Sequence, residues 1–200
     1  FPDSATIYYQ HFPLRNLSYG GALFLTKISL KKADICISPS KTLLGIARKE
    51  GCTKGFFIPN SVDTKFYSPS FQDRVLVRQR LNIQPNDLVL AIVGVIEPWI
   101  DFKILFDGLE DLRKIYGDSI RLLVIGSSIT GYDKVIKSEV KKRGLEKIIH
   151  FTDYLPEPEI RNFLSAADIG VISYVKHQLN SIARLPVKFF IYSSMSLPIL

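Results

Sequence analysis

Short apolar runs alternate with amphipathic stretches of helical length along most of this 200-residue chain. Runs such as 88–93 are apolar without alternation, as expected for strands that helices cover on both faces. The pattern therefore predicts an α/β fold built on parallel sheets. Strands are predicted at 6–9, 34–38, 56–59, 88–94, 121–126, 148–151 and 168–173, and helices at 18–33, 40–50, 101–116, 130–143, 157–166 and 186–195.

A polar, turn-rich stretch interrupts this alternation at 60–74, "NSVDTKFYSPSFQDR", and is predicted to be a linker. The pattern restarts after it with a strand, a glycine turn and a helix. We therefore expect two α/β units, the tail of a first domain with its linker at 1–70 and a second domain at 71–200. The sequence begins without Met and stops inside an apolar run, so we expect both ends to be cut.

The net charge of +7 is compatible with a phosphate-rich ligand, an anionic membrane surface or nucleic acid, or with solvated lysines on helix faces. The basic residues are spread over the predicted helices and are not clustered with aromatic residues, so no nucleic-acid partner is expected. No apolar run reaches the ~18 residues of a membrane span. Cys36 and Cys52 have neither metal-ligand nor CxxC spacing, and a reducing cytoplasm is expected.

Two glycines at the ends of predicted strands and one loop suggest a ligand-binding cleft. In an open parallel sheet, ligands bind beyond the carboxyl ends of the strands, where helix N-termini present N–H groups. Gly94 and Gly126 each end a predicted strand, and the loop 176–185 precedes the last helix. We therefore expect a phosphorylated ligand at this edge. The sequence has neither a DxD triplet nor a His/Asp cluster, so no metal ion is expected.

Six segments in order carry a more specific resemblance. They are "ADICISPSKTLLGIARKEG", "FFIPNSVDTKFYSP", "LVLAIVG", "LLVIG", "IHFTDYLPEPEIRNFLSAADIGVIS" and "LPVKFFIYSSMSLPIL". Their order and spacing resemble the retaining glycosyltransferases of family 4, over nearly the whole chain. That family has the GT-B architecture of two Rossmann-like domains, of which the first would be only partly present here.

The resemblance implies a nucleoside-diphosphate sugar as donor, held by the second domain, with no further cofactor. A glycan or lipid-linked acceptor is implied for the first domain. A cytoplasmic protein that works at the inner face of a membrane, through peripheral contact with it, fits such an acceptor. Two alternatives stay open, namely a catalytically degenerate GT-B protein that acts as a binding or scaffolding module, and a sugar-nucleotide epimerase on the same fold.

Four charges that family members use are absent from the matching positions. The two Glu positions of the last motif fall on Ala183 and Ile191, and the Arg and Lys that follow the first strand of the second domain fall on Val95 and Ile100. Isoleucine cannot accept a hydrogen bond from a ribose hydroxyl. Ile191→Glu is therefore expected to tighten a nucleoside diphosphate roughly tenfold if this side chain faces the ligand, and to damage the fold if it is buried.

Other residues are predicted to replace those charges. Lys188 matches the Lys of the family's Pro-x-Lys pattern, and Arg184 lies just before the helix that Pro186 is expected to start. Both are predicted to approach the diphosphate, with solvated surface residues as the alternative. The predicted donor-binding set is Gly94, Val95, Glu97, Trp99, Gly126, Ser127, Tyr154, Arg184, Lys188 and Ile191.

His11, in "YYQHFP", resembles the family histidine that faces the sugar and is the predicted catalytic residue, with a simple loop histidine as the alternative. The stretch "GVIEPWIDFKIL" resembles a branch of the family with the pattern GYIGAIxEWFDFEL, and Asp101 in it is predicted to cap the following helix. Tyr154 lies in the turn expected to meet the nucleobase, where Asp153 replaces the usual glycine. His150 is predicted to be a structural strand residue, and His177 lies in the loop before the last helix.

Overall fold

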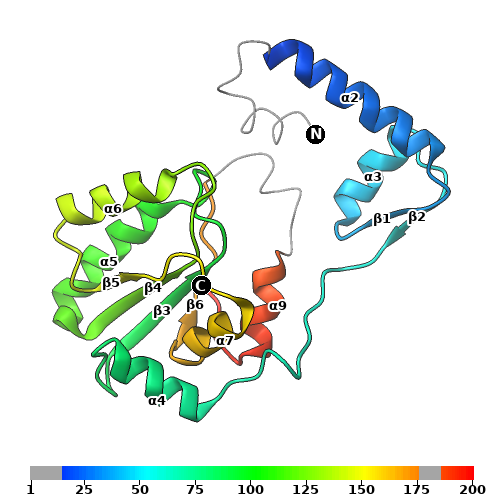
Figure 1. The fold of residues 1–200 in the computed structure, drawn as a ribbon. Helices are drawn as coiled ribbons and strands as arrows, with labels where there is room; N and C mark the ends of the chain where they lie inside the picture. Colours follow the sequence, from blue (N-terminus) through cyan, green and yellow to red (C-terminus); the bar gives the residue numbers. More distant parts are fainter. Residues whose placement is uncertain (1–14, 176–185) are drawn as a thin grey trace. The chain divides into compact units, whose positions relative to one another are not determined.

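The computed structural model describes residues 15–175 and 186–200, which form two compact units (Figure 1). Of the described residues, the first unit contains those up to Asn60 together with Pro186, and the second comprises Ser61–Val175 and Val187–Leu200. The strand expected at 6–9, the loop 176–185 and the side chains of His11, His177 and Arg184 lie outside the described residues.

The first unit contains helices α2 (Arg15–Lys32) and α3 (Lys41–Lys49) and strands β1 (Cys36–Ser38) and β2 (Gly55–Phe57). The strands are parallel, with Cys36 opposite Gly55. Helix α3 starts at a conventional cap, since the Ser40 hydroxyl accepts a hydrogen bond from the Leu43 N–H at 3.3 Å. An ion pair of 3.0 Å between Lys27 and Glu50 joins α2 to the end of α3.

The second unit is built on a four-stranded sheet in which every pair is parallel. The strand order is β5-β4-β3-β6, so consecutive strands are joined by crossover helices. Its strands are β3 (Leu88–Val93), β4 (Ile120–Ile125), β5 (Ile149–Phe151) and β6 (Ile169–Gly170), and its helices are α4 (Phe71–Arg80), α5 (Phe102–Tyr116), η1 (Gly117–Ser119), α6 (Tyr132–Lys142), α7 (Glu157–Ser165) and α9 (Val187–Ser194). The end of the chain extends the sheet, because Gly170 N–H donates to the Pro198 carbonyl at 2.8 Å and Leu200 N–H donates to the Gly170 carbonyl at 2.9 Å.

Apolar clusters cover both faces of this sheet, as predicted by strand sequences that are apolar without alternation. Leu90 and Ile92 of β3 face the first cluster, and Val89, Ala91 and Val93 face the second. Helices α5 and α6 cover the first face, and α4, α7 and α9 cover the second. The first cluster includes Phe102, Leu105, Phe106, Leu109, Ile136 and Val140, and the second includes Val77, Phe163, Leu164, Tyr192 and Met195.

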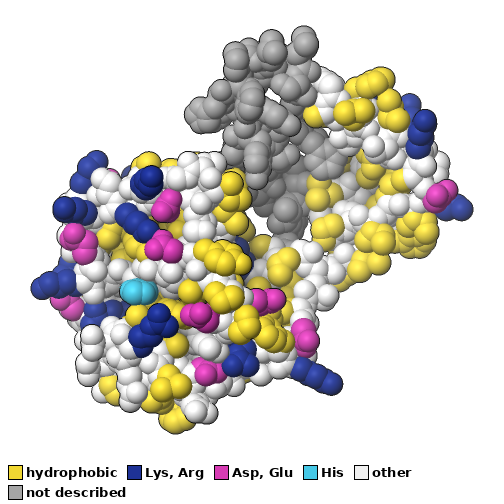
Figure 2. All heavy atoms as spheres, viewed as in Figure 1, with side chains coloured by type: hydrophobic (Ala, Val, Ile, Leu, Met, Phe, Trp, Pro, Cys, Tyr) yellow, Lys and Arg dark blue, Asp and Glu magenta, His cyan; other side chains and the backbone are white. Residues whose placement is uncertain are grey.

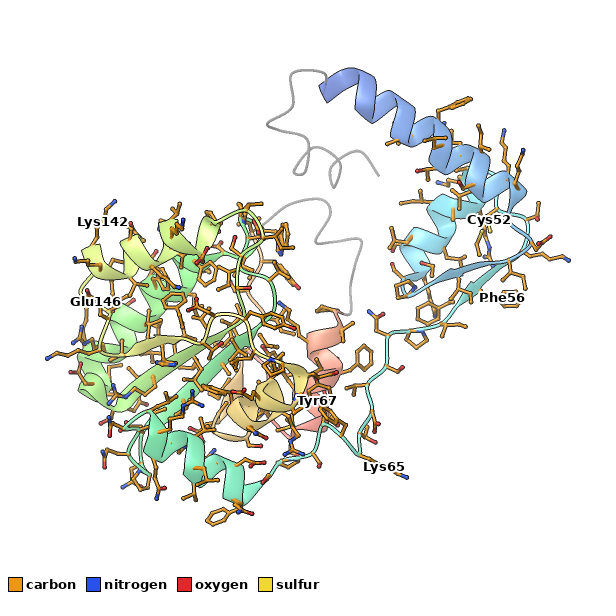
Figure 3. All side chains as sticks on the ribbon, viewed as in Figure 1. Cys52, Phe56, Lys65, Tyr67, Lys142 and Glu146 are labelled. Carbon is orange, nitrogen blue, oxygen red and sulfur yellow. The ribbon has the colours of Figure 1, made fainter. Side chains whose placement is uncertain are left out.

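Helix α4 corrects the prediction of a linker at 60–74, because a helix begins at Phe71. Ser70 caps it by accepting a hydrogen bond from the Asp73 N–H at 3.2 Å. The segment before it, expected to belong with the first unit, packs on the second: Tyr67 (Figure 3) is 5% exposed, and its hydroxyl donates to Glu157 at 3.0 Å. Burial, followed by this contact with Glu157, raises the pKa of Tyr67 to about 12.

On the face shown in Figure 2, basic and acidic side chains are interspersed over the second unit. The second unit also has exposed ion pairs, such as Lys103 with Asp107 at 2.7 Å. The excess positive charge is therefore not gathered into one stripe on that face. No helix in the described part of the chain is long and apolar enough to cross a membrane.

Candidate functional site

Two glycine turns form the floor of the candidate site, at the carboxyl ends of β3 and β4. Gly94 has a φ of 133° and Gly126 a φ of 134°, which is backbone geometry that only glycine adopts readily. Gly94 N–H donates to the Ile125 carbonyl at 2.9 Å, and Gly126 N–H donates to the Thr152 hydroxyl at 3.2 Å. A Cβ on Gly126 would overlap the carbonyl oxygen of Gly94. The two turns therefore touch backbone to backbone.

The side chain of Lys188, the second residue of α9, lies over the first of these turns. A Cβ built on Gly94 would lie 3.4 Å from the Lys188 amine, which also sits 5.1 Å from the ring centroid of Tyr174. Burial lowers the pKa of Lys188 to about 8. No carboxylate among residues 15–175 and 186–200 pairs with this amine. We call Gly94, Gly126, Tyr174 and Lys188 the carboxyl-end site.

Tyr192 fixes α9, and with it Lys188, against the sheet. Its buried hydroxyl accepts a hydrogen bond from the Val93 N–H at 2.9 Å and donates to the Val171 carbonyl at 3.2 Å. A Cβ on Gly170 would lie 2.5 Å from the Tyr192 ring, so this position needs glycine for steric reasons. Burial raises the pKa of Tyr192 above that of an ordinary phenol. This role of Tyr192 was not predicted from the sequence, although Tyr192 directly follows Ile191, a predicted donor-binding residue.

Glu97 is directed into the loop that follows β4. It is 2% exposed, and its carboxylate accepts four hydrogen bonds of 2.6–3.0 Å from Ser128, Ile129 and Thr130. Burial alone would raise the pKa of Glu97, but these hydrogen bonds, with the Thr130 hydroxyl first, hold it below the usual value. Glu97 therefore positions the loop beside Gly126.

Three other predicted residues line the same edge. Val95, directly after Gly94, is 40% exposed. The Ser127 carbonyl accepts a hydrogen bond from the Ile96 N–H at 3.0 Å, which ties the loops after β3 and β4 together. The Trp99 ring packs against the first apolar cluster. The backbone carbonyl of Trp99 accepts a hydrogen bond from the Val175 N–H at 3.0 Å.

Tyr154 and Ile191 lie in contrasting surroundings. Tyr154 is 79% exposed, on the turn after β5. Ile191 is partly buried and packs against the second apolar cluster. The sequence analysis left open whether Ile191 faces the ligand or is buried. Its packing against this cluster favours burial.

Asp153 and Ser196 both stand where the family has glycine, Ser196 at the glycine of the last motif (EYxAxGxPV), and both keep a backbone conformation typical of glycine. Asp153 has a φ of 57° and Ser196 a φ of 56°. Both lie in the left-handed region, which short polar residues tolerate better than bulky ones. Asp153 also accepts a hydrogen bond from Lys137 at 2.6 Å. The substitutions therefore preserve the course of the chain at these two turns.

Two predictions of structural roles are confirmed. Asp101 caps α5, since its carboxylate accepts a hydrogen bond from the Ile104 N–H at 3.0 Å. His150 lies in β5, with its ring stacked on Phe163 at a centroid distance of 6.4 Å. No group of three or more His, Cys, Asp or Glu side chains that could hold a metal ion occurs in the described ranges.

The model of the family described as glycosyl transferases group 1 matches residues 73–177, just over half of the chain. A search of curated proteins gives no match.

Several solved structures share the fold. The Anabaena protein HepE in complex with UDP-glucose is 19% identical, with a TM-score of 0.69 over 95% of this chain and 49% of HepE. Sucrose-phosphate synthase from Thermosynechococcus elongatus is 18% identical, with a TM-score of 0.73 over 100% of this chain and 48% of the synthase. WaaG, a glycosyltransferase involved in lipopolysaccharide biosynthesis, is 14% identical, with a TM-score of 0.70 over 98% of this chain and 53% of WaaG.

This chain thus spans about half the length of these proteins, and at such identities the likeness establishes the fold alone. The expected fold class is confirmed: α/β of GT-B type, with parallel sheets.

Proposed function

Since the chain belongs to the family of glycosyl transferases group 1, we propose that its second unit binds a nucleoside-diphosphate sugar whose sugar is transferred to a glycan or lipid-linked acceptor. The observation that carries this proposal is the Lys188 amine over the Gly94 turn, without a carboxylate partner among the described residues. HepE, which shares the fold, is bound to UDP-glucose. We propose UDP as the first nucleotide to test.

Sugar transfer from a nucleoside diphosphate requires positive charge near the diphosphate. Negative charge builds on the diphosphate as its bond to the sugar breaks, so a preorganised cation there lowers the barrier. Ile100, at the family's Lys position, is 2% exposed within the first apolar cluster and has no charge to offer. Lys188 supplies that charge in this chain, and Arg184 is proposed as a second cation.

The transfer is proposed to follow the family-4 course, with retention at the anomeric carbon. No side-chain nucleophile is needed, because the leaving phosphate helps to deprotonate the acceptor on the same face of the sugar. His11 is proposed to assist on the sugar side. We propose no metal ion or other cofactor and no nucleic-acid partner. The free cysteines fit a cytoplasmic protein, and a lipid-linked acceptor would bring it to the inner face of a membrane by peripheral contact.

Replacing Lys188 with Met is expected to weaken UDP binding by about 10-fold to 100-fold, because a charge-assisted hydrogen bond contributes about 1.5–3 kcal/mol. Isothermal titration calorimetry of the chain with UDP measures the effect. Lys134→Met is the matched control, since Lys134 is an exposed lysine of α6. Equal affinities for the two variants would remove Lys188 from the site.

The same titration has a pH dependence with a definite sign. The charged amine binds the diphosphate, and the pKa of Lys188 in the free protein is about 8. UDP affinity should therefore be highest below pH 8 and fall by up to about tenfold per pH unit above it. The slope should disappear in Lys188→Met and persist in Lys134→Met. A slope that survives in Lys188→Met would assign the titration to another group.

A degenerate GT-B binding module is the second candidate, favoured by the absence of charge at Val95, Ile100 and Ile191. The two candidates differ in turnover and not in binding. A panel of nucleoside-diphosphate sugars, offered with glycan and lipid-linked acceptors, should release the free nucleoside diphosphate if the protein is a transferase. Tight UDP binding with no release from any donor would favour the binding module.

Ile191→Glu restores the glutamate that the family pattern has at this position of its last motif. Because Ile191 packs against the second apolar cluster, the new carboxylate should destabilise the fold by about 1–3 kcal/mol and leave UDP affinity unchanged. Urea unfolding and calorimetry measure the two quantities. Ser193→Glu, at an exposed position of the same helix, is the control and should unfold nearly like the original chain. UDP binding tightened tenfold in Ile191→Glu would mean that this side chain turns toward the ligand.

A further inference from the structure

Two thiols lie together in the first unit, at the start of β1 and in the turn after α3. Cys36 lies opposite Gly55 in the parallel strand pair, and side chains of registered neighbours project from the same face of a sheet. A Cβ built on Gly55 would lie 3.2 Å from the Sγ of Cys52. The Cys52 sulfur therefore occupies the space beside Cys36 that the glycine leaves open. Figure 3 labels Cys52 beside the two strands.

The state of the two side chains supports this arrangement. Both cysteines are free. The hydrogen bond with Cys52 raises the pKa of the Cys36 thiol, with smaller contributions from burial and from the Cys52 charge. Cys52 is 5% exposed, whereas Cys36 is only partly buried. Cys36 is thus the thiol that a small molecule in solvent reaches first, and Cys52 is the thiol behind it.

We propose that Cys36 and Cys52 are a redox-sensitive pair that closes a reversible disulfide on exposure to a small-molecule disulfide such as oxidised glutathione. The pair is brought together by the fold, since no CxxC spacing joins the two cysteines in sequence. Cys52 lies beside the residue opposite Cys36 and is hydrogen-bonded to Cys36, and such proximity of two thiols is the first requirement of a disulfide. This inference does not depend on the proposed sugar transfer.

The exchange proceeds in two balanced steps. The Cys36 thiolate attacks one sulfur of the oxidised glutathione, whose S–S bond breaks and releases one glutathione thiol. The Cys52 thiolate then attacks the Cys36 sulfur and displaces the second glutathione. Two electrons pass from the protein thiols to the oxidant, and the two protons leave with the released glutathione thiols.

The new bond would enclose α3 in a covalent loop. It would join Cys36, the first residue of β1 before α3, to Cys52, in the turn between α3 and β2. The disulfide restricts the unfolded chain more than the folded one, so oxidation should make the first unit harder to unfold. Reduction by a dithiol reverses the effect.

The test uses the full chain, incubated with oxidised glutathione and then treated with an alkylating agent. Intact mass is expected to fall by two hydrogen atoms, with no alkylation and no glutathione adduct, and proteolysis should give one peptide pair joined through Cys36 and Cys52. Dithiothreitol should restore both thiols. The rate of thiol loss should rise with pH between 7 and 8, because the raised pKa keeps Cys36 mainly protonated there and the thiolate is the reacting form.

Two serine variants make the outcome decisive. Cys52→Ser should stop at a stable glutathione adduct on Cys36, and Cys36→Ser should react little, since its remaining thiol is buried. Circular dichroism confirms that each variant is folded. Stable glutathione adducts on the unsubstituted chain, disulfide-linked dimers, or a Cys36 that reacts only in urea would each overturn the proposal.

Discussion

Asp168→Ala should lower the free energy of unfolding by about 3–5 kcal/mol, because it removes the partner of a buried arginine. Arg78 is 5% exposed, and its guanidinium donates to an Asp168 oxygen at 2.8 Å. Arg74 donates to the other oxygen at 2.6 Å. The Val89 N–H, at the start of the central strand, also donates to Asp168, at 2.8 Å. The substitution therefore leaves the buried Arg78 cation without its counter-ion, with only backbone carbonyls to accept from it, and leaves the Val89 N–H without its acceptor.

An exposed Arg–Asp pair of the same chain provides the control. Arg113 and Asp118 form an ion pair of 2.7 Å, with 32% and 46% of their side chains exposed. Asp118→Ala should cost no more than about 1 kcal/mol, because water and salt screen an exposed pair. Urea unfolding of both variants gives the comparison. Similar losses for the two would show that burial does not strengthen the Asp168 pair.

Gly126→Ala should cost about 3 kcal/mol or more and also abolish UDP binding under the proposed function. The Cβ would overlap the Gly94 carbonyl, which is backbone and has no rotamer to move into. The φ of 134° adds strain for any residue with a side chain. The two turns at the carboxyl-end site would have to separate, and Lys188 over Gly94 would lose its place.

Gly108→Ala is the matched control for this substitution. Gly108 lies inside α5, and nothing lies within 4 Å of the added Cβ. Alanine there should raise the free energy of unfolding by about 0.5–1 kcal/mol, through its better helix propensity. Thermal unfolding and UDP titration of both variants are the measurements. If Gly126→Ala bound UDP like the original chain, the two-glycine floor would have no part in the site.

Most of the second unit was predictable because its signals are local. The sequences at 88–94 and 121–126 predict strands, and the structure has β3 and β4 there, buried on both faces. Helix α4 was not predicted to begin at Phe71, because Ser68, Pro69 and Ser70 directly before it and Asp73 in its first turn are residues typical of turns. A usable signal was present, since Ser70 with Asp73 three residues later is a helix-start pattern.

The candidate site was only half predictable, for a different reason. Gly94 and Gly126 could be located from the sequence, since each follows a strand. The direction of Glu97 could not, because its acceptor role depends on N–H groups of the loop 128–130, more than thirty residues away. The role of Tyr192 depends likewise on Val93 and Val171.

The sequence by itself determined the α/β class, the parallel order of strand and helix, and the edge of the sheet at which we propose that a ligand binds, since hydrophobic period and turn chemistry are properties of short segments. The tertiary structure alone decided which side chains reach that edge. Lys188 acquires its low pKa from burial beside Gly94 and Tyr174, and Ile191, three residues along the same helix, packs against the core. Desolvation and steric clearance depend on residues distant in sequence, so they appear only when the chain is folded.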